Sequence, residues 1–307
     1  MPPNQVWSSA FRRFAGGRAF GRLKAELQTK FSAVHRAAFS LIEMMVVVAL
    51  MTVIILGLMM MFGQVQRAFR AGITQTDVLE GGRAVADMLS RELAGVMPSY
   101  QSQVANFYAE IPAATSVSHQ ALPGANGDSR INVLEKLFFL TRENQTWTGY
   151  GYLVDDNGSG VGTLYRYTAA ANVSQNPGTL YGNFSGLLPG NASLHRVMDG
   201  VVQFRIRAFD TNGLWITKDL PHTNTSDIRL SGAGFAPGEV GLYVFKSNAV
   251  PACVEFEVGI LEKRVYERFK AMPDYNAQTN YLARQVGAVH LFRQRVPIRT
   301  VDVKAYQ

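Results

Sequence analysis

The sequence predicts an α+β fold in which a long N-terminal helix packs on an antiparallel β-sheet. An almost uninterrupted apolar run covers residues 41–62, and an amphipathic helical pattern continues from there to Pro98. Beyond residue 130, short runs of alternating polar and apolar residues are separated by Gly, Asn and Asp turn signals, which is typical of strands joined by hairpins.

The positive charge of the chain is concentrated at its N-terminus. The net formal charge of the 307 residues is +7, and residues 1–38 contribute most of it, with seven basic residues against one acidic residue. The rest is nearly neutral, so we expect no nucleic-acid partner. Because Cys253 is the single cysteine, no internal disulfide can form, and its strand-like surroundings predict a buried structural thiol.

The apolar run from Leu41 to Phe62 is long enough to cross the hydrocarbon core of a membrane, which is about 30 Å thick. The stronger basic cluster lies before the run, so we expect the N-terminus in the cytoplasm and residues beyond about 65 outside. The end of the run lacks a clear small-residue cleavage site, which argues against an ordinary secretory signal peptide.

Glu43 is the one charged residue in this run, and a carboxylate in an apolar span normally needs a partner or a function. The string AFSLIEMMVVV, from Ala38 to Val48, closely resembles the cleavage and methylation motif of type IV prepilins and pseudopilins. The resemblance implies that a prepilin peptidase/methyltransferase cuts between Ala38 and Phe39 and then methylates the amino group of Phe39. It also implies that Glu43, the fifth residue of the mature chain, acts in filament assembly.

The motif departs from the usual family pattern at one position. The family usually has Gly before the cut, where this chain has Ala38. The alternative is an ordinary signal anchor that carries a glutamate by chance.

The resemblance divides the chain into four segments and implies a pilin-like fold. Residues 1–38 are a basic cytoplasmic leader that is cleaved, and residues 39–63 are a transmembrane helix. Residues 64–98 are an amphipathic helix, interrupted near Gly81 and Gly82. Residues 99–307 are an extracytoplasmic antiparallel β domain with an extended C-terminal tail.

Within the β domain, residues 99–130 are expected to be a surface loop and Asn132–Thr141 a buried strand. Residues 149–154 and 163–168 flank a turn rich in Asp, Asn and Gly, which predicts a hairpin. Asp155 and Asp156 in this turn are weaker candidates for calcium ligands, because no bidentate Glu follows at EF-hand spacing.

Residues 169–194 have a loop-like composition. In Val201–Phe209 the alternation predicts a strand with Val202, Phe204, Ile206 and Ala208 on one face. We expect a turn at 210–213, the start of a partner strand at 214–216, a loop over 218–239, and strands at 241–246 and 252–261. The tail from Glu262 is either a basic binding surface or a solvated region with one extra strand in AVHLFRQRVPI.

Several C-terminal motifs occur in an order that resembles the J-type minor pseudopilin of type II secretion systems. They are the Met198–Val201 segment, Asp210, Trp215 and the Pro251-led final strand. The resemblance implies an initiating or tip subunit in the bacterial inner membrane, with I- and K-type minor pseudopilins and the major pseudopilin as partners. The helix 81–96 resembles the W-type minor pilins of type IV pili about equally well, which implies a pilus subunit with an adhesive or DNA-uptake role.

An enzyme is the least supported class. The sequence has no HExxH pair, no GxSxG nucleophile elbow and no phosphate-binding loop. We therefore expect no catalytic residue, no cofactor and no metal beyond the calcium alternative. The five histidines are scattered along the chain: His35, His119, His195, His222 and His290.

Overall fold

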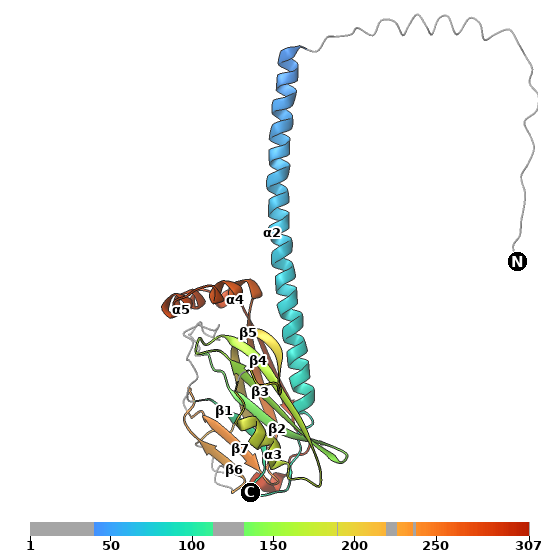
Figure 1. The fold of residues 1–307 in the computed structure, drawn as a ribbon, viewed down its shortest axis with the longest axis vertical. Coiled ribbons are helices and arrows are strands. Elements are labelled where there is room, and N and C mark those ends of the chain that lie inside the picture. Colours follow the sequence, from blue (N-terminus) through green and yellow to red (C-terminus); the bar gives the residue numbers. More distant parts are fainter. Residues whose placement is uncertain (1–39, 113–131, 189, 219–225, 236–237, 307) are drawn as a thin grey trace, which may run out of the picture. The chain divides into compact units, whose positions relative to one another are not determined.

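The computed structural model of this chain describes residues 40–112, 132–188, 190–218, 226–235 and 238–306. It shows a long helix, an antiparallel nine-stranded sheet that curls, and shorter helices (Figure 1), which confirms the predicted α+β class. Ala38 and Phe39 lie outside the described residues. The chain divides into two compact units, residues 1–65 and residues 66–307.

Helix α2 runs without a break from Leu41 to Leu93. In the first unit, its large apolar side chains are exposed. In the second unit, its buried side chains recur at helical spacing and face the sheet, as an amphipathic helix requires. These buried residues are Val78, Val85, Ala86, Leu89 and Leu93.

The predicted interruption at Gly81 and Gly82 is wrong, because both residues lie inside the continuous helix. Their role is packing. A Cβ atom on Gly81 would lie 2.8 Å from Cε of Met198, and one on Gly82 would overlap the ring of Phe292. The two glycines let the sheet approach the helix backbone closely, and this contact compensates for their low helix propensity.

The sheet has the strand order β6-β7-β1-β2-β3-β4-β5-β8-β9, and every neighbouring pair is antiparallel. The strands are β1 (Ala105–Glu110), β2 (Lys136–Glu143), β3 (Thr146–Asp155), β4 (Gly162–Asn172), β5 (Leu194–Phe209), β6 (Ile228–Ser231), β7 (Leu242–Lys246), β8 (Cys253–Leu261) and β9 (Val289–Pro297).

The β3–β4 hairpin, β7 and β8 confirm the predicted elements. Three segments predicted as loops contain regular structure instead: β1, β6 and the helix α3 (Gly178–Ser185). Strand β1 lies between β2 and β7, which are its partners from distant parts of the sequence. A short strand without an adjacent hairpin partner gives a weak local pattern, and this explains the error.

The predicted strand Asn132–Thr141 is divided in two. Residues from 136 onward form β2, whereas Leu134 bridges Phe204 of β5 in a parallel arrangement. The N–H of Glu135 donates to the carbonyl of Phe204 at 2.8 Å. Likewise, residues 214–216 form no full strand, because only Trp215 bridges Phe209.

Strand β5 contains a bulge that changes its predicted faces. The pairing with β8 shifts between Val201 and Gln203. As a result Val201, and not Val202, shares the main core with Phe204 and Ile206, while Val202 belongs to a separate apolar cluster. One extra residue on one strand reverses the alternation, and a periodic pattern in the sequence cannot show it.

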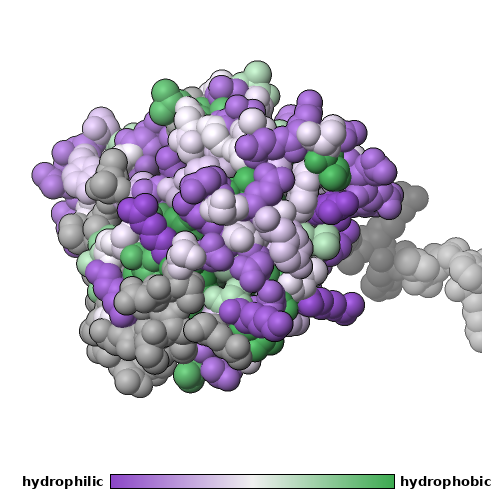
Figure 2. Space-filling model, turned by 90° about the horizontal axis from the view of Figure 1, so that it is seen from below, coloured by the Kyte–Doolittle hydropathy of each residue, from purple (hydrophilic) through white to green (hydrophobic). Residues whose placement is uncertain are grey.

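Three apolar clusters hold the second unit together. The main one lies between α2 and the sheet, and a second lies under α3. The third lies under two helices of the C-terminal tail, α4 (Lys263–Lys270) and α5 (Tyr275–Ala283). The face shown in Figure 2 is mostly hydrophilic, with small separate hydrophobic areas.

The tail is integrated into this fold. Strand β9 confirms the extra-strand interpretation of AVHLFRQRVPI. After it, the Thr300 hydroxyl donates to the carbonyl of Val96 at 2.5 Å, and the buried Tyr306 hydroxyl donates to the carbonyl of Val250 at 2.7 Å. Cys253, expected to be buried, is half-buried at the start of β8, and this burial raises the pKa of its thiol.

The glycine contact can be tested with a matched pair of variants. We expect Gly82→Ala to lower the free energy of unfolding by about 1–3 kcal/mol, because the new methyl group overlaps the Phe292 ring. Gly72→Ala is the control, since no heavy atom lies within 4 Å of its added Cβ, and we expect it to stabilise the chain by about 0.5–1 kcal/mol. Chemical unfolding of the full chain in detergent micelles measures both, and equal effects would contradict the packing role of Gly82.

Candidate functional site

The first turn of α2 carries the candidate assembly residue. The N–H of Met44 donates to the carbonyl of Ser40 at 3.2 Å, so the helix begins one residue later, at Leu41. Glu43 lies in this first turn with an exposed side chain. A negative charge is favoured there, because the unpaired N–H groups of the turn give the helix end a partial positive charge.

The helix that follows Glu43 is suited to lipid or to other apolar helices. Among the described residues, α2 is the one helix long and apolar enough to cross a membrane, and none of its apolar window is buried within the chain. The hydroxyl of Thr52, a polar group in this stretch, donates to the carbonyl of Val48 at 2.8 Å. That bond satisfies the hydroxyl within the helix, as an apolar surrounding requires.

The carboxylates of Asp155 and Asp156 are bound by the backbone of their own turn. Asp156 accepts hydrogen bonds from the N–H groups of Gly158 (3.3 Å) and Gly160 (2.9 Å), and Asp155 accepts one from Asn157 (3.4 Å). In the described part of the chain, no group of three or more His, Cys, Asp or Glu residues is placed to hold a metal ion. This geometry is that of a hairpin turn.

Charged residues of β5 and β8 form a cluster with Glu135, which lies just before β2 and has a strongly altered pKa. Burial raises the pKa of Glu135 to about 8, and its carboxylate accepts a hydrogen bond from the N–H of Ile206 at 3.1 Å. Altered pKa values often mark catalytic sites. Glu135, however, is only 3% exposed, so a reactant cannot reach it in the folded chain.

The rest of this cluster consists of ion pairs. Arg207 contacts Glu255 at 2.8 Å and Glu257 at 3.0 Å, and Arg205 pairs with Glu239. Both carboxylates next to Arg207 are buried, so each would be costly without its cation. The cluster therefore holds the strands in register.

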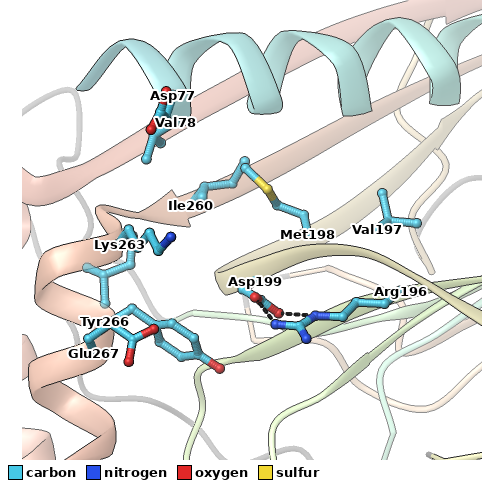
Figure 3. Close-up of a pocket in the computed structure, with 11 residues that line it drawn as sticks. Asp77, Val78, Arg196, Val197, Met198, Asp199, Ile260, Lys263, Tyr266 and Glu267 are labelled. Atoms are coloured by element: carbon cyan, nitrogen blue, oxygen red, sulfur yellow. Dashed lines mark hydrogen bonds and ion pairs between the residues drawn. The ribbon is translucent and has the colours of Figure 1, made fainter. Parts of the chain in front are cut away.

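A cavity of about 280 Å³ lies between α2, β5, β8 and α4 (Figure 3). Asp77 and Val78 of α2 face Ile260 of β8 across it, and α4 closes one side. On the floor, Arg196 Nε donates to Asp199 Oδ1 at 2.8 Å, so these two charges neutralise each other.

Glu92 is a further polar residue of α2 that contacts the sheet, and nothing in the local sequence indicates it. Its carboxylate binds Arg166 of β4 and Tyr152 of β3, which lie far away along the chain. The amphipathic pattern of residues 64–98 predicts that this helix packs on the sheet, but it does not indicate the polar contact of Glu92.

Comparison with known proteins supports the interpretation of the N-terminus. Residues 34–59 match the family model of the prokaryotic N-terminal methylation motif, a range that includes Ala38, Phe39 and Glu43. No curated protein matches the chain.

The matched motif supports a type IV pilin-like protein. It implies processing by a prepilin peptidase and assembly into pilus-like filaments. Proteins with this motif are structural pilin subunits, and the apolar helix α2 fits a single-pass protein of the inner membrane.

Proposed function

We propose that this chain is a minor pseudopilin that initiates or caps the pseudopilus of a type II secretion system. In this proposal the leader is cytoplasmic, the apolar half of α2 crosses the inner membrane, and the sheet unit is periplasmic. The observation that carries the proposal is Glu43, the single charge of the apolar run, in the first turn of α2 and inside the matched motif.

The chemistry of Glu43 explains why a filament subunit needs it. Extraction of the helix from lipid into a filament places the carboxylate among apolar helices, where an unpaired charge is costly. The methylated amino group of Phe39 on a neighbouring subunit is a cation of suitable position and charge. Pairing the two groups sets the axial position of one subunit against the next.

The minor, tip-type role is supported by the size and the motifs of the outer unit. The second unit spans residues 66–307, large for a repeating shaft element. The motifs that resemble J-type minor pseudopilins lie on connected elements: Met198–Val201 in β5, Trp215 after it, and Pro251 before β8.

The second candidate is a W-type minor pilin of a type IV pilus, with an adhesive or DNA-uptake role. The observation that favours it is the helix from Gly81 to Leu93, which resembles those pilins about as well. The two candidates share their processing and differ in their partners.

Processing is the first test. Co-expression with a prepilin peptidase is expected to remove the 38 residues before Phe39, and mass spectrometry is expected to find an N-methylated Phe39 at the new terminus. Ala38→Gly, which restores the usual residue of the family, should be cut at least as fast. An intact leader, or a cut after Phe62, would overturn the proposal.

A second prediction concerns Glu43. We expect Glu43→Leu to insert into the membrane and to be cleaved, because the change only makes the span more apolar. We expect it to lose secretion or filament formation, because the partner of the neighbouring amino group is missing. Glu80→Leu, which removes an exposed carboxylate of the same helix, is the control and should assemble normally. Wild-type secretion by the Glu43 variant would show that the ion pair is not needed.

A third prediction separates the two systems. A fragment that starts near residue 64 is expected to be soluble and to elute in a complex with I- and K-type minor pseudopilins in size-exclusion chromatography. The exposed apolar side chains of α2 before Val78, such as Phe69 and Ile73, offer a surface for that contact. Association with W-type pilus partners alone would favour the second candidate.

A further inference from the structure

The tail hairpin of α4 and α5 presents a basic surface, and the fold itself uses two of its side chains. Arg268 lies over the ring of Tyr281, 5.9 Å from its centroid, and Lys270 lies over the ring of Tyr266, 5.2 Å from its centroid. The apolar side chains of α4, Tyr266 and Phe269, are buried against the third cluster, together with Leu282 of α5. None of the basic side chains on the other faces of this hairpin forms an ion pair with a described carboxylate. They are all exposed: Lys263, Arg264, Arg268, Lys270 and, just after α5, Arg284.

The acidic groups on the same hairpin do not balance this charge. Asp274 caps α5 and accepts the N–H of Ala277 at 3.0 Å, and Glu262 lies 3.4 Å from Nε2 of His290. Glu267 is the one exposed carboxylate within α4 itself.

Acidic groups also face α4 from neighbouring elements. Asp77 of α2 lines the same cavity as Lys263. Asp199 of β5 attracts Lys270, but it is already held by Arg196 and by Thr163, whose hydroxyl donates at 2.8 Å. Asp155 and Asp156 line a pocket together with Lys270, although their carboxylates accept hydrogen bonds from the N–H groups of their own turn. The positive surface that remains is therefore centred away from Lys270, on Arg264 and Arg268, which lie one helical turn apart.

The position of α4 in the second unit indicates what the basic surface could bind. Helix α4 closes the cavity that Asp77 and Val78 line, so it packs beside the N-terminal end of the buried part of α2 (Figure 3). That is the end of the unit where the chain arrives from the apolar run. Asp77 follows Phe62 by only about four helical turns.

We propose that the α4–α5 hairpin docks on anionic phospholipid headgroups of the membrane in which the chain is anchored. Clusters of Lys and Arg on an amphipathic helix near a membrane segment are attracted to anionic lipids. Tyr275, 48% exposed at the start of α5, adds an aromatic ring of the kind found at headgroup level.

The proposal rests on the membrane anchoring that belongs to the proposed function, and it does not depend on which filament the chain joins. Its consequence is a second attachment to the bilayer, beside α2. This attachment holds the sheet unit against the membrane before assembly and is released when the subunit is extracted.

Hydrogen exchange of the full-length chain in nanodiscs tests the proposal. One set of nanodiscs contains phosphatidylcholine alone, and the other contains phosphatidylcholine with phosphatidylglycerol. We expect peptides from residues 263–284 to exchange at least about threefold more slowly with the anionic lipid, and high salt to remove the difference. Peptides from β3 should exchange equally in both.

Matched variants identify the charges responsible. A chain with Lys263→Glu, Arg264→Glu and Arg268→Glu should lose the lipid-dependent protection. A chain with Arg229→Glu, Arg299→Glu and Lys304→Glu carries the same change of charge on other exposed positions and should keep it.

Two results would overturn the proposal. The first is equal exchange of residues 263–284 in both nanodiscs. The second is protection that appears only when a partner protein is added, whatever the lipid, which would assign the surface to an acidic protein. Incorporation into nanodiscs is scored separately by co-purification. A chain that does not stay in the disc would overturn the anchoring itself, whereas one that stays without lipid-dependent protection overturns only the docking.

Discussion

The carboxylate of Glu92 joins the end of α2 to two strands of the sheet at once. Its Oε1 atom accepts hydrogen bonds from Arg166 at 2.9 Å and 2.6 Å, and its Oε2 atom accepts the hydroxyl of Tyr152. Leu89 and Leu93, beside it on the helix, are fully buried. Separating the helix from the sheet would leave the largely buried carboxylate of Glu92 without its partners. It would also expose the apolar surface of Leu89 and Leu93 to water, and both changes cost free energy. The contact therefore fixes the helix along the sheet, and the glycine contacts and the α4 cavity depend on that position.

The sequence predicted those features that have a local cause. The apolar run, Glu43 in its first turn, and the β3–β4 hairpin with its Asp-rich turn all lie in continuous segments with a clear period or turn signal. The features that were not predicted depend on distant contacts. Gly82 resembles a helix break until Phe292 of β9 is placed against it. The bulge near Val201 follows from pairing with β8, and Glu92 gains its partners only when the sheet closes on the helix.

Helix α2 performs two tasks in two separate stretches. Among the side chains of α2 that the structure describes, the buried ones begin at Val78, so the main core of the second unit does not use the exposed apolar residues described before it. The apolar stretch is thus free to exchange lipid for neighbouring helices without unfolding the sheet unit, as the transfer of a subunit from membrane to filament requires. Glu43 is the exception to its apolarity, and it lies in the first turn, where the partial positive charge of the helix end favours a carboxylate.

The C-terminal tail, for which the sequence left two interpretations open, is part of the surface that packs against α2. Strand β9 supplies Phe292 to the glycine contact, and Thr300 binds the carbonyl of Val96 just after the helix. Tyr306 is buried in the main apolar cluster. The α4–α5 hairpin lies between β8 and β9 in the sequence, and these two strands pair with each other in the sheet. Both ends of the hairpin are therefore attached to the sheet. Its basic residues therefore have a fixed direction relative to the helix, which a loose appendage would not give them.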